Sequence, residues 1–443
     1  SRFGTSAPTA AREGPRFRPP GASPSPTKTL RAAMPLRSAS AAIVLALAPR
    51  ALAELRGNAQ PAAALPWNHS LLEQGSEHVN LVTQYEGAEV PEMHVESNAG
   101  GETHIFAIGD WGTLLPGHLT APNVRPRGSK NKCPEKCEYV EGIDDRAQLL
   151  VAAAMKSRAA KSNPQYVLNV GDSFYWGGIT QPCGVGLSSV NGHTMREFGY
   201  VWTSVYGSLT NKPWISALGN HDYGGYMYSN AWDQIVAYSR VNPNWVMPAR
   251  YFSRKMRHPG FTVEYFVIDS NAMDAKDPGE DPEHNICGEA HNIPGASCAS
   301  VGGPSSPKHC KEWFWSSYRT QQAWLERKLA ASSADWQIVV THFQCHHESG
   351  WYQKLHHQYG LDLLVTGHRH AQEIHNVGGL ACFVTGGGGG VTSEHVPKGE
   401  YTDQYGFFDL TLSKDTIKLE SVNLHGKVVD SKIVKKKQRL LLL

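Results

Sequence analysis

Five short apolar runs in this chain end in residues that can bind metal ions. The runs cover residues 103–108, 166–170, 214–218, 337–341 and 361–366, and the residues that follow or close them are Gly109-Asp110-Trp111-Gly112, Gly171-Asp172-Ser173-Phe174-Tyr175, Gly219-Asn220-His221-Asp222, His342, and Gly367-His368-Arg369-His370. A Gly directly after a buried strand lets the backbone turn sharply, so the next side chain can point into a crevice. One Gly-Asp pair could be ordinary turn chemistry. Five such ends in order instead predict a ligand site at the carboxyl ends of strands in an α/β fold.

Seven of these side chains carry the donor atoms of a transition-metal site: Asp110, Asp172, Tyr175, Asn220, His342, His368 and His370. Oxygen donors mixed with imidazoles suit Fe, Mn or Zn better than Ca or Mg. Seven donors are too many for one catalytic zinc ion, which uses three protein ligands. The set therefore predicts two metal ions that share a carboxylate, generate hydroxide near neutral pH and bind a phosphoryl oxygen.

The order of these motifs resembles a known family. Gly-Asp-x-Gly, Gly-Asp-x-x-Tyr, Gly-Asn-His-Asp, a single strand-end His and Gly-His-x-His are similar to the motifs of the calcineurin-like metallophosphoesterases. Tyr175 narrows the resemblance to purple acid phosphatases of the short, tartrate-resistant type, over roughly residues 101–434. The resemblance implies an α/β fold, a four-layer α/β/β/α sandwich with a single catalytic domain.

The resemblance also implies a role for each site residue. Fe(III) would bind Asp110, Tyr175 and His370, a second Fe, Zn or Mn ion would bind Asn220, His342 and His368, and Asp172 would bridge the two ions. His221 would be catalytic, either contacting the phosphate or assisting protonation of the leaving group, and Asn220 would also contact the phosphate. Arg369 could also hold the phosphate through a bidentate contact. A metal-bound hydroxide would then attack phosphorus in line and displace an alcohol.

The sequence departs from the family pattern in three places. Ser173 stands where Asn is usual, His342 is followed by Phe343-Gln344-Cys345 instead of a proline-containing turn, and only 26 positions separate His342 from His368. The family's other histidine beside the phosphate therefore has no single match, and His346 and His347 are the candidates. These departures leave the general acid open and do not affect the metal site.

Composition and charge exclude several other classes of protein. Of the 443 residues, 40% are hydrophobic and 19% are charged, which is typical of a globular protein. Residues 1–53 and the end from Lys427 are basic, and the part between them has a net charge of −10, so binding to nucleic acid is not expected. No apolar run reaches the ~18 residues of a membrane span. We expect a monomer without stable membrane association, acting on a phosphate ester.

The N-terminal 100 residues are not expected to belong to the catalytic domain. Residues 1–33 are rich in Pro, Ala, Ser and Arg and are predicted to be disordered or an upstream extension. Residues 34–53 have the pattern of a signal peptide: Arg37, an apolar stretch over 39–48, and the cleavage site Ala51-Leu52-Ala53. A poorly ordered amphipathic arm is the alternative. Residues 54–100 show little periodicity and are predicted to be a poorly structured leader.

The cysteines and a glycosylation sequon agree with export to the outside or to an endomembrane, lysosome-like compartment. Asn68-His69-Ser70 is the sequon. The eight cysteines form an even set suited to disulfides, and the pairing stays open. Cys133 and Cys137 have a spacing that zinc could use, but no second close pair follows at the distance of a zinc finger.

The remaining segments fit an α/β domain with insertions. Helices are predicted over 143–161 and around Tyr318, Leu325 and Leu329, which share one helix face. Segments 113–139 and 274–311 are predicted to be disulfide-tied loops that could overhang the metal site. The glycines at 386–390 follow a strand-like run, and a turn near the site is favoured over a flexible linker. Strands are predicted over 406–412, 416–422 and 427–434, before a basic and apolar tail, 435–443.

These observations predict a secreted acid phosphatase that uses two metal ions to hydrolyse phosphate monoesters. A phosphodiesterase or pyrophosphatase of the same superfamily is one alternative, because the same metals and nucleophile serve diesters. A secreted binding protein whose site no longer turns over is the other. Trp176 and Tyr223 could wall the substrate pocket, although ordinary packing is favoured for both.

Overall fold

The computed structural model describes residues 82–96, 102–112, 142–185, 190–282, 284–391 and 404–437. All of them belong to one compact unit, Ala64–Leu443. The predictions for the upstream extension, the signal peptide, the sequon and the loop 113–139 lie outside the described residues. Among the residues that are described, no helix combines the length and the apolar character needed to cross a membrane.

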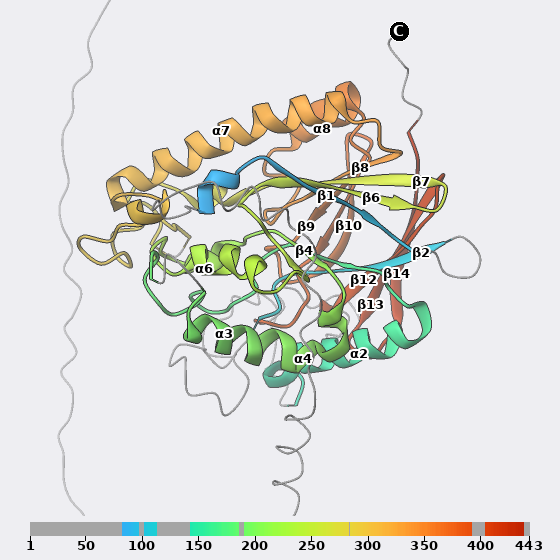
Figure 1. The fold of residues 1–443 in the computed structure, drawn as a ribbon, viewed down its shortest axis with the longest axis horizontal. Coiled ribbons are helices and arrows are strands. Elements are labelled where there is room, and N and C mark those ends of the chain that lie inside the picture. Colours follow the sequence, from blue (N-terminus) through green and yellow to red (C-terminus); the bar gives the residue numbers. More distant parts are fainter. Residues whose placement is uncertain are drawn as a thin grey trace, which may run out of the picture. The chain divides into compact units, whose positions relative to one another are not determined.

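Two seven-stranded sheets form the centre of this unit (Figure 1). The order in the first sheet is β1 (Ala88–His94), β6 (Phe252–His258), β7 (Phe261–Val267), β8 (Trp336–Val340), β9 (Leu363–Thr366), β11 (Leu380–Thr385) and β10 (Gln372–Val377). The order in the second sheet is β14 (Val428–Lys435), β13 (Thr416–Asn423), β12 (Gly406–Leu412), β2 (Thr103–Ile108), β3 (Val167–Asn169), β4 (Trp214–Ser216) and β5 (Trp245–Val246).

The strands that precede the candidate metal ligands are parallel and buried. In the second sheet β2, β3 and β4 pair in parallel, and in the first sheet β8 pairs in parallel with β9. Parallel strands buried on both faces are nearly continuous apolar runs, so their sequences are easy to recognise. Each of the five lies within two residues of its expected range.

Helices cover the outer faces of both sheets. The longer ones are α2 (Ala147–Ser162), α3 (Gly192–Phe198), α6 (Trp232–Ala237), α7 (Pro307–Ala331) and α8 (Ser349–Tyr359), and the shortest are α4 (Ser204–Tyr206) and α5 (Asn220–Tyr223). Single turns of 3-10 or π helix lie between them: η2 (Val82–Tyr85), η3 (Asp144–Arg146), η4 (Gly199–Thr203), η5 (Gly207–Asn211), η6 (Tyr238–Arg240), η7 (Asn271–Asp274) and η8 (Ala299–Val301). Figure 1 shows α7 and α8 on one side of the sheets and α2, α3 and α4 on the other.

Three hydrophobic clusters separate the layers, as a four-layer sandwich requires. Along β2, Phe106 and Ile108 face the cluster under α2 and α3, whereas Ile105 and Ala107 face the cluster between the two sheets. This alternation follows from the period of two in a strand. A third cluster packs the outer face of the first sheet against α7 and α8, where Leu325 contributes from α7. The predicted α/β/β/α sandwich is therefore confirmed.

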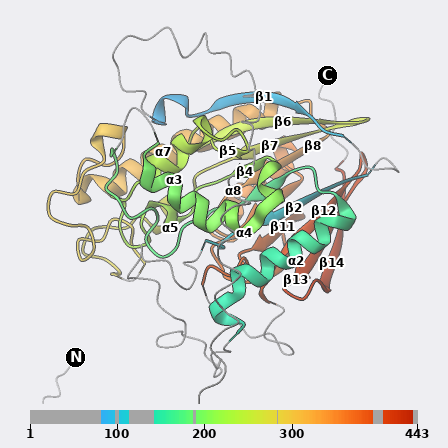
Figure 2. The same cartoon turned by 60° about the horizontal axis from the view of Figure 1, so that its bottom comes forward.

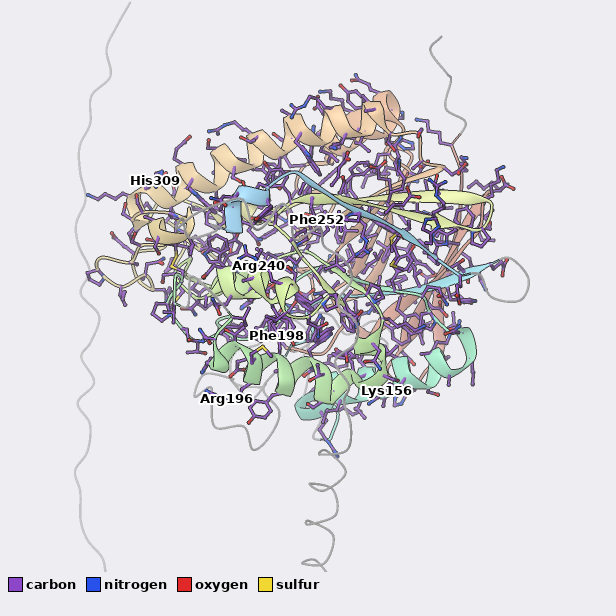
Figure 3. The ribbon with its side chains drawn as sticks, viewed as in Figure 1. Lys156, Arg196, Phe198, Arg240, Phe252 and His309 are labelled. Carbon is purple, nitrogen blue, oxygen red and sulfur yellow. A yellow bond between two sulfur atoms is a disulfide. The ribbon has the colours of Figure 1, made fainter. Side chains whose placement is uncertain are left out.

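Polar contacts fix the helices to the sheets and to one another. Arg158 of α2 pairs with Asp409 of β12 (2.7 Å) and Glu420 of β13 (2.8 Å), and Figure 2 shows α2 lying across these strands. Lys156, labelled in Figure 3, donates from α2 to the carbonyl of Val205 in α4 (2.9 Å). These contacts join α2 both to the second sheet and to the neighbouring helix α4.

The segment predicted to be a poorly structured leader contains a strand. Within 54–100, β1 pairs in parallel with β6 and forms one edge of the first sheet. Only Val90 of its seven residues is buried, and Pro91 interrupts the pattern. Pro is tolerated on an edge strand, where one side of the backbone needs no partner. The exposed edge position explains why the sequence shows so little periodicity here.

The long insertion between β7 and α7 is tied by disulfides, as expected. Cys287 pairs with Cys310 at the start of α7, and Cys298 pairs with Cys183 in the loop after β3. A third disulfide joins Cys345 to Cys382 of β11. The insertion is therefore tied at Cys287 to the start of α7 and at Cys298 to the loop after β3.

The five-glycine run after β11 is a packed turn beside the candidate site. The amide of Gly388 donates to the carbonyl of Gly109 (3.1 Å), and the amide of Gly390 donates to the carbonyl of Asp110 (2.8 Å). A Cβ atom on Gly388 would lie 2.3 Å from the Gly109 oxygen, and one on Gly390 would lie 2.5 Å from the Tyr175 ring. Only glycine allows the backbone to approach this closely, so the prediction of a turn near the site is confirmed.

We predict that Gly388→Ala destabilises the protein, because the new methyl group meets backbone that cannot move away. Overpacking of this kind costs about 1–3 kcal/mol, measurable by urea unfolding. The matched control is Gly279→Ala, since a Cβ there meets nothing within 4 Å. Equal stability of the two variants would contradict the packed turn.

Candidate metal centre

The donor residues lie where the strand ends of the two sheets meet. Asp110, Asp172 and Asn220 follow β2, β3 and β4 of the second sheet, and His342 and His368 follow β8 and β9 of the first. Asp110, Asp172 and His368 adopt left-handed backbone conformations, with φ of 57°, 51° and 67°. Such conformations cost about 1–2 kcal/mol per residue and concentrate at functional sites. The turns therefore give up stability to aim these side chains at one point.

The first group of donors surrounds the Tyr175 hydroxyl. This oxygen lies 2.7 Å from Asp172 Oδ2, 3.1 Å from Asp110 Oδ1 and 3.1 Å from His370 Nε2. A phenol carries one proton and can satisfy one of these acceptors. The group therefore has fewer protons than lone pairs directed into it.

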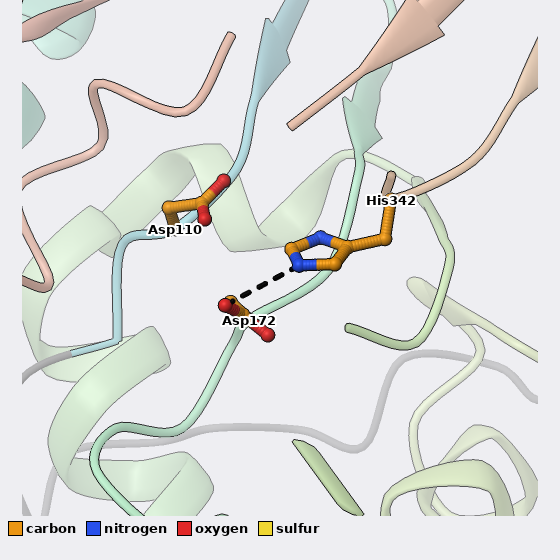
Figure 4. Close-up of side chains that lie close together, drawn as sticks. All are labelled: Asp110, Asp172 and His342. Atoms are coloured by element: carbon orange, nitrogen blue, oxygen red, sulfur yellow. Dashed lines mark ion pairs between the residues drawn. The ribbon is translucent and has the colours of Figure 1, made fainter. Parts of the chain in front are cut away.

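The second group surrounds the amide oxygen of Asn220. His342 Nε2 and His368 Nδ1 each lie 3.1 Å from this oxygen. The other ring nitrogen of His342 donates to the carbonyl of Val170 (2.9 Å), so in the neutral ring Nε2 holds a lone pair. Nε2 lies 3.4 Å from Asp172 Oδ2, and the two form an ion pair when the ring is protonated (Figure 4). Two imidazole nitrogens and a carboxylate oxygen thus gather around one amide oxygen.

Asp172 lies between the two groups. Its Oδ2 is close both to the Tyr175 hydroxyl and to His342, and its Oδ1 accepts the amide of His221 (2.8 Å). Donor atoms of Asp110, Asp172 and His342 all lie within 4.8 Å of one another. This is the position that a carboxylate shared by two ions would occupy. Asp172 as the bridging ligand stays a prediction, as do the assignments of the other six donors.

The pKa values of the buried groups reflect the same excess of acceptors. Burial and then the neighbouring Asp172 raise the pKa of Asp110 well above its usual range, although His342 opposes this. Burial disfavours a charged His342, but the carboxylates of Asp172 and Asp110 outweigh it and raise its pKa to about 9. Without a cation, protons must take up the negative charge. A pair of metal ions would replace those protons, so the residues present fit two bound cations.

Two residues that we did not assign from the sequence hold the ligands in place. Asp222 accepts the amides of Ser173 and Gly219, each at 2.8 Å, and so joins the turn after β3 to the turn after β4. Asn169 accepts from the Trp111 indole (2.9 Å) and donates to the Ser173 hydroxyl (3.0 Å). The sequence could have indicated Asp222, because it belongs to the Gly-Asn-His-Asp motif. Nothing in the sequence marks Asn169.

The two expected substrate-binding residues His221 and Arg369 differ in their surroundings. His221 is buried beside the donors, and its Nδ1 donates to the carbonyl of Trp176 (2.5 Å). Arg369 pairs through Nε with Glu373 of β10 (3.2 Å). The ion pair gives Arg369 a structural role. Contact of Arg369 with a phosphate stays a prediction.

The remaining candidates near the site lie on its borders. His347 lies 3.0 Å from Gln344 Oε1 and its ring stacks on His346, and neither is bonded to the donor groups. Tyr223 is fully buried and its hydroxyl donates to Asp269 (2.7 Å), so packing accounts for it. Trp176 is half-buried and its ring lies 4.8 Å from the His221 ring, where it can border a substrate.

The chain is similar to known phosphatases. The family model described as calcineurin-like phosphoesterase matches residues 103–372. The chain is 25% identical to tartrate-resistant acid phosphatase type 5 of Oryctolagus cuniculus, over 68% of this chain and 79% of that protein. It is 23% identical to purple acid phosphatase 3 of Arabidopsis thaliana, over 77% and 80% of the two chains.

Among solved structures, the fold is similar to "GAP50 the anchor in the inner membrane complex of Plasmodium". The TM-score is 0.50 at 15% sequence identity, and the match covers 76% of this chain and 90% of that one. At this identity the likeness concerns the fold alone.

We predict that Asp172→Ala loses metal from both positions, because it removes an acceptor from each donor group. Elemental analysis after purification should show two ions per chain in the unaltered protein and fewer than one in the variant. The control Asp277→Asn changes an exposed carboxylate of the insertion. Full metal content in Asp172→Ala would exclude the bridging role.

We also predict that Asp222→Ala destabilises the fold by about 2–4 kcal/mol, because two buried amides lose their acceptor. Urea unfolding of the metal-free protein measures this loss independently of metal binding. Asp222→Asn, which keeps one acceptor oxygen, should recover part of the lost stability. A loss of the same size in both variants would show that the amide contacts are not the cause.

Proposed function

The chain belongs to the calcineurin-like phosphoesterases, and from that premise we propose that it is an acid phosphatase that hydrolyses phosphate monoesters with two bound metal ions. The observation that carries the proposal is the convergence of seven side chains whose carboxylate, phenol, amide and imidazole atoms can all bind metal ions. Such a cluster is stable when cations lie within it.

The two donor groups suit different ions. Asp110, Tyr175 and His370 would hold Fe(III), because a phenol ligand favours a strongly charged cation. Asn220, His342 and His368 would hold a second Fe, Zn or Mn ion, and Asp172 would contact both. When bound, the pair of ions supplies a hydroxide nucleophile and positive charge for the phosphoryl oxygens.

The residues of the chain itself would bind and orient the substrate. His221 lies against the Tyr175 ring, with ring centroids 4.4 Å apart, and its Nδ1 is held by the Trp176 carbonyl. That bond fixes the ring so that Nε2 can face a phosphoryl oxygen. Asn220, on the same turn, would contact the phosphate beside it. Trp176 would exclude water from one side.

We infer that the protein acts in a secreted or endomembrane compartment. Three disulfides join the described cysteines, two of them inside or at the ends of the long insertion. Disulfides of this kind form and persist in oxidising compartments. The signal peptide proposed for residues 34–53 would lead there.

We predict hydrolysis of p-nitrophenyl phosphate below pH 7 and much slower hydrolysis of bis(p-nitrophenyl) phosphate. Comparable rates on both would favour the phosphodiesterase alternative. Metal-replete protein without activity on either ester, or on pyrophosphate, would favour a binding protein.

We further predict a visible charge-transfer band from the Tyr175 phenolate to Fe(III). The band should disappear in Tyr175→Phe and persist in Tyr223→Phe, since the Tyr223 hydroxyl is bonded to Asp269 instead. An active, iron-free and colourless protein would show that the site uses Zn or Mn alone.

A further inference from the structure

Three aromatic rings follow one another outward from the candidate site. The Trp176 ring lies 5.9 Å from the Tyr175 ring and 4.8 Å from the His221 ring, measured between centroids. The Tyr226 ring lies 6.2 Å from Trp176, and the His291 ring lies 5.0 Å from Tyr226. We call Trp176, Tyr226 and His291 the aromatic strip. One end of the strip adjoins a candidate metal donor, and the other end belongs to the long insertion between β7 and α7.

The exposure of the rings increases along the strip. Tyr175 and His221 are buried, at 4% and 8% exposed. Trp176 and Tyr226 are half-buried, and His291 is exposed. The strip therefore runs from the buried donor residues to the surface, and a molecule whose phosphate is bound at the donors can lie along it.

Packing of the core does not account for Trp176 and Tyr226. Neither residue belongs to any of the three hydrophobic clusters of the described residues, whereas Trp313 and Trp315, which are also half-buried, pack against one of them. Tyrosine and tryptophan are enriched where proteins bind other molecules, because they combine a large apolar ring with a polar group. The strip thus has the character of a binding surface.

Hydrogen bonds join the three chain segments that carry the strip. The side-chain amide of Asn230 donates to the carbonyl of Gly177, which links the segments of the first two rings. Asn292, in the insertion, accepts the amide of Tyr228 (3.2 Å), and the Tyr228 hydroxyl donates to the carbonyl of Ala296 (2.6 Å). These two contacts link the segments of the second and third rings. A surface that is ordered in advance loses little conformational entropy when a ligand binds.

We propose that the aromatic strip selects substrates whose phosphate is attached to an aromatic ring, such as phosphotyrosine, an inference that rests on the phosphomonoesterase function proposed above. With the phosphate at the donor residues, the ring of the leaving group lies against Trp176 and Tyr226. Aromatic rings attract one another in stacked and edge-to-face arrangements, and an alkyl leaving group offers no such face. The strip therefore determines specificity and takes no part in breaking the ester bond.

The first test measures the ratio of kcat/KM on phosphotyrosine to kcat/KM on phosphoserine. We expect this ratio to fall about 3- to 10-fold in Tyr226→Leu, because leucine keeps an apolar side chain but has no aromatic face. Each variant is compared with the unaltered protein on the same ester, so the different basicities of the two leaving groups do not affect the result. Tyr226→Phe keeps the ring and should keep the ratio.

A second test measures binding and does not depend on turnover. Phenylphosphonate and cyclohexylphosphonate are inert and similar in size, and only the first has a flat aromatic ring. Calorimetry on the metal-loaded protein should give a lower Kd for phenylphosphonate, and Tyr226→Leu should abolish this preference.

The matched control is Tyr359→Leu, which removes a half-buried tyrosine ring at the end of α8. The Tyr359 hydroxyl is bonded to Glu326 (3.4 Å), and Tyr359 precedes β9 whereas the donors follow this strand. This variant should show the same ratio on the two esters and the same preference between the phosphonates as the unaltered protein.

The outcomes separate the strip from the proposed function. Hydrolysis of both esters with an unchanged ratio in Tyr226→Leu would overturn the role of the strip and leave the phosphatase function in place. A ratio that falls equally in Tyr226→Phe, or equal Kd values for the two phosphonates in the unaltered protein, would also overturn it. Metal-loaded protein that hydrolyses neither ester would instead overturn the phosphatase function, and the inference on specificity with it.

Discussion

The fold around the candidate site has to hold buried carboxylate, phenol, amide and imidazole atoms close to one another. Tyr175 Oη has two carboxylate oxygens and one imidazole nitrogen within 3.1 Å, and Asn220 Oδ1 faces two imidazole nitrogens at the same distance. Left to themselves, these groups would repel one another or take up protons. Parallel strands, three left-handed turns, the Asp222 bridge and the packed glycines hold them in place. The rigidity of the surroundings is what the ligand geometry requires.

The sequence predicts the parts of the fold that have strong periodicity. The five strands that precede the donors are continuous apolar runs, so both their positions and the residues at their ends could be identified. The strand β1 was missed because an edge strand with one buried residue and a proline has no clear pattern. The distribution of the five strands over two facing sheets is likewise not encoded locally, since it depends on which strands pair.

The candidate site was also predictable only where its residues belong to recognisable motifs. The seven donors share recognisable motifs, and the structure brings all of them together. Asn169 could not be identified, because a buried Asn acquires its importance from neighbours distant in sequence, in this case Trp111. Arg369 shows the opposite case: it lies inside a strong motif, yet its guanidinium pairs with Glu373. A motif therefore predicts which residues lie near the site, but not which atoms each side chain contacts.

The division of the donors between the sheets has a consequence for assembly. Neither half of the sandwich carries a complete ligand set, because β2, β3 and β4 supply one part and β8 and β9 the other. The full ligand set of the proposed metal centre therefore forms only when the two sheets have packed together. By linkage, whatever free energy the ions gain on binding also resists separation of the two halves. In such an arrangement the proposed ions would stabilise the packing of the two sheets as well as act in catalysis.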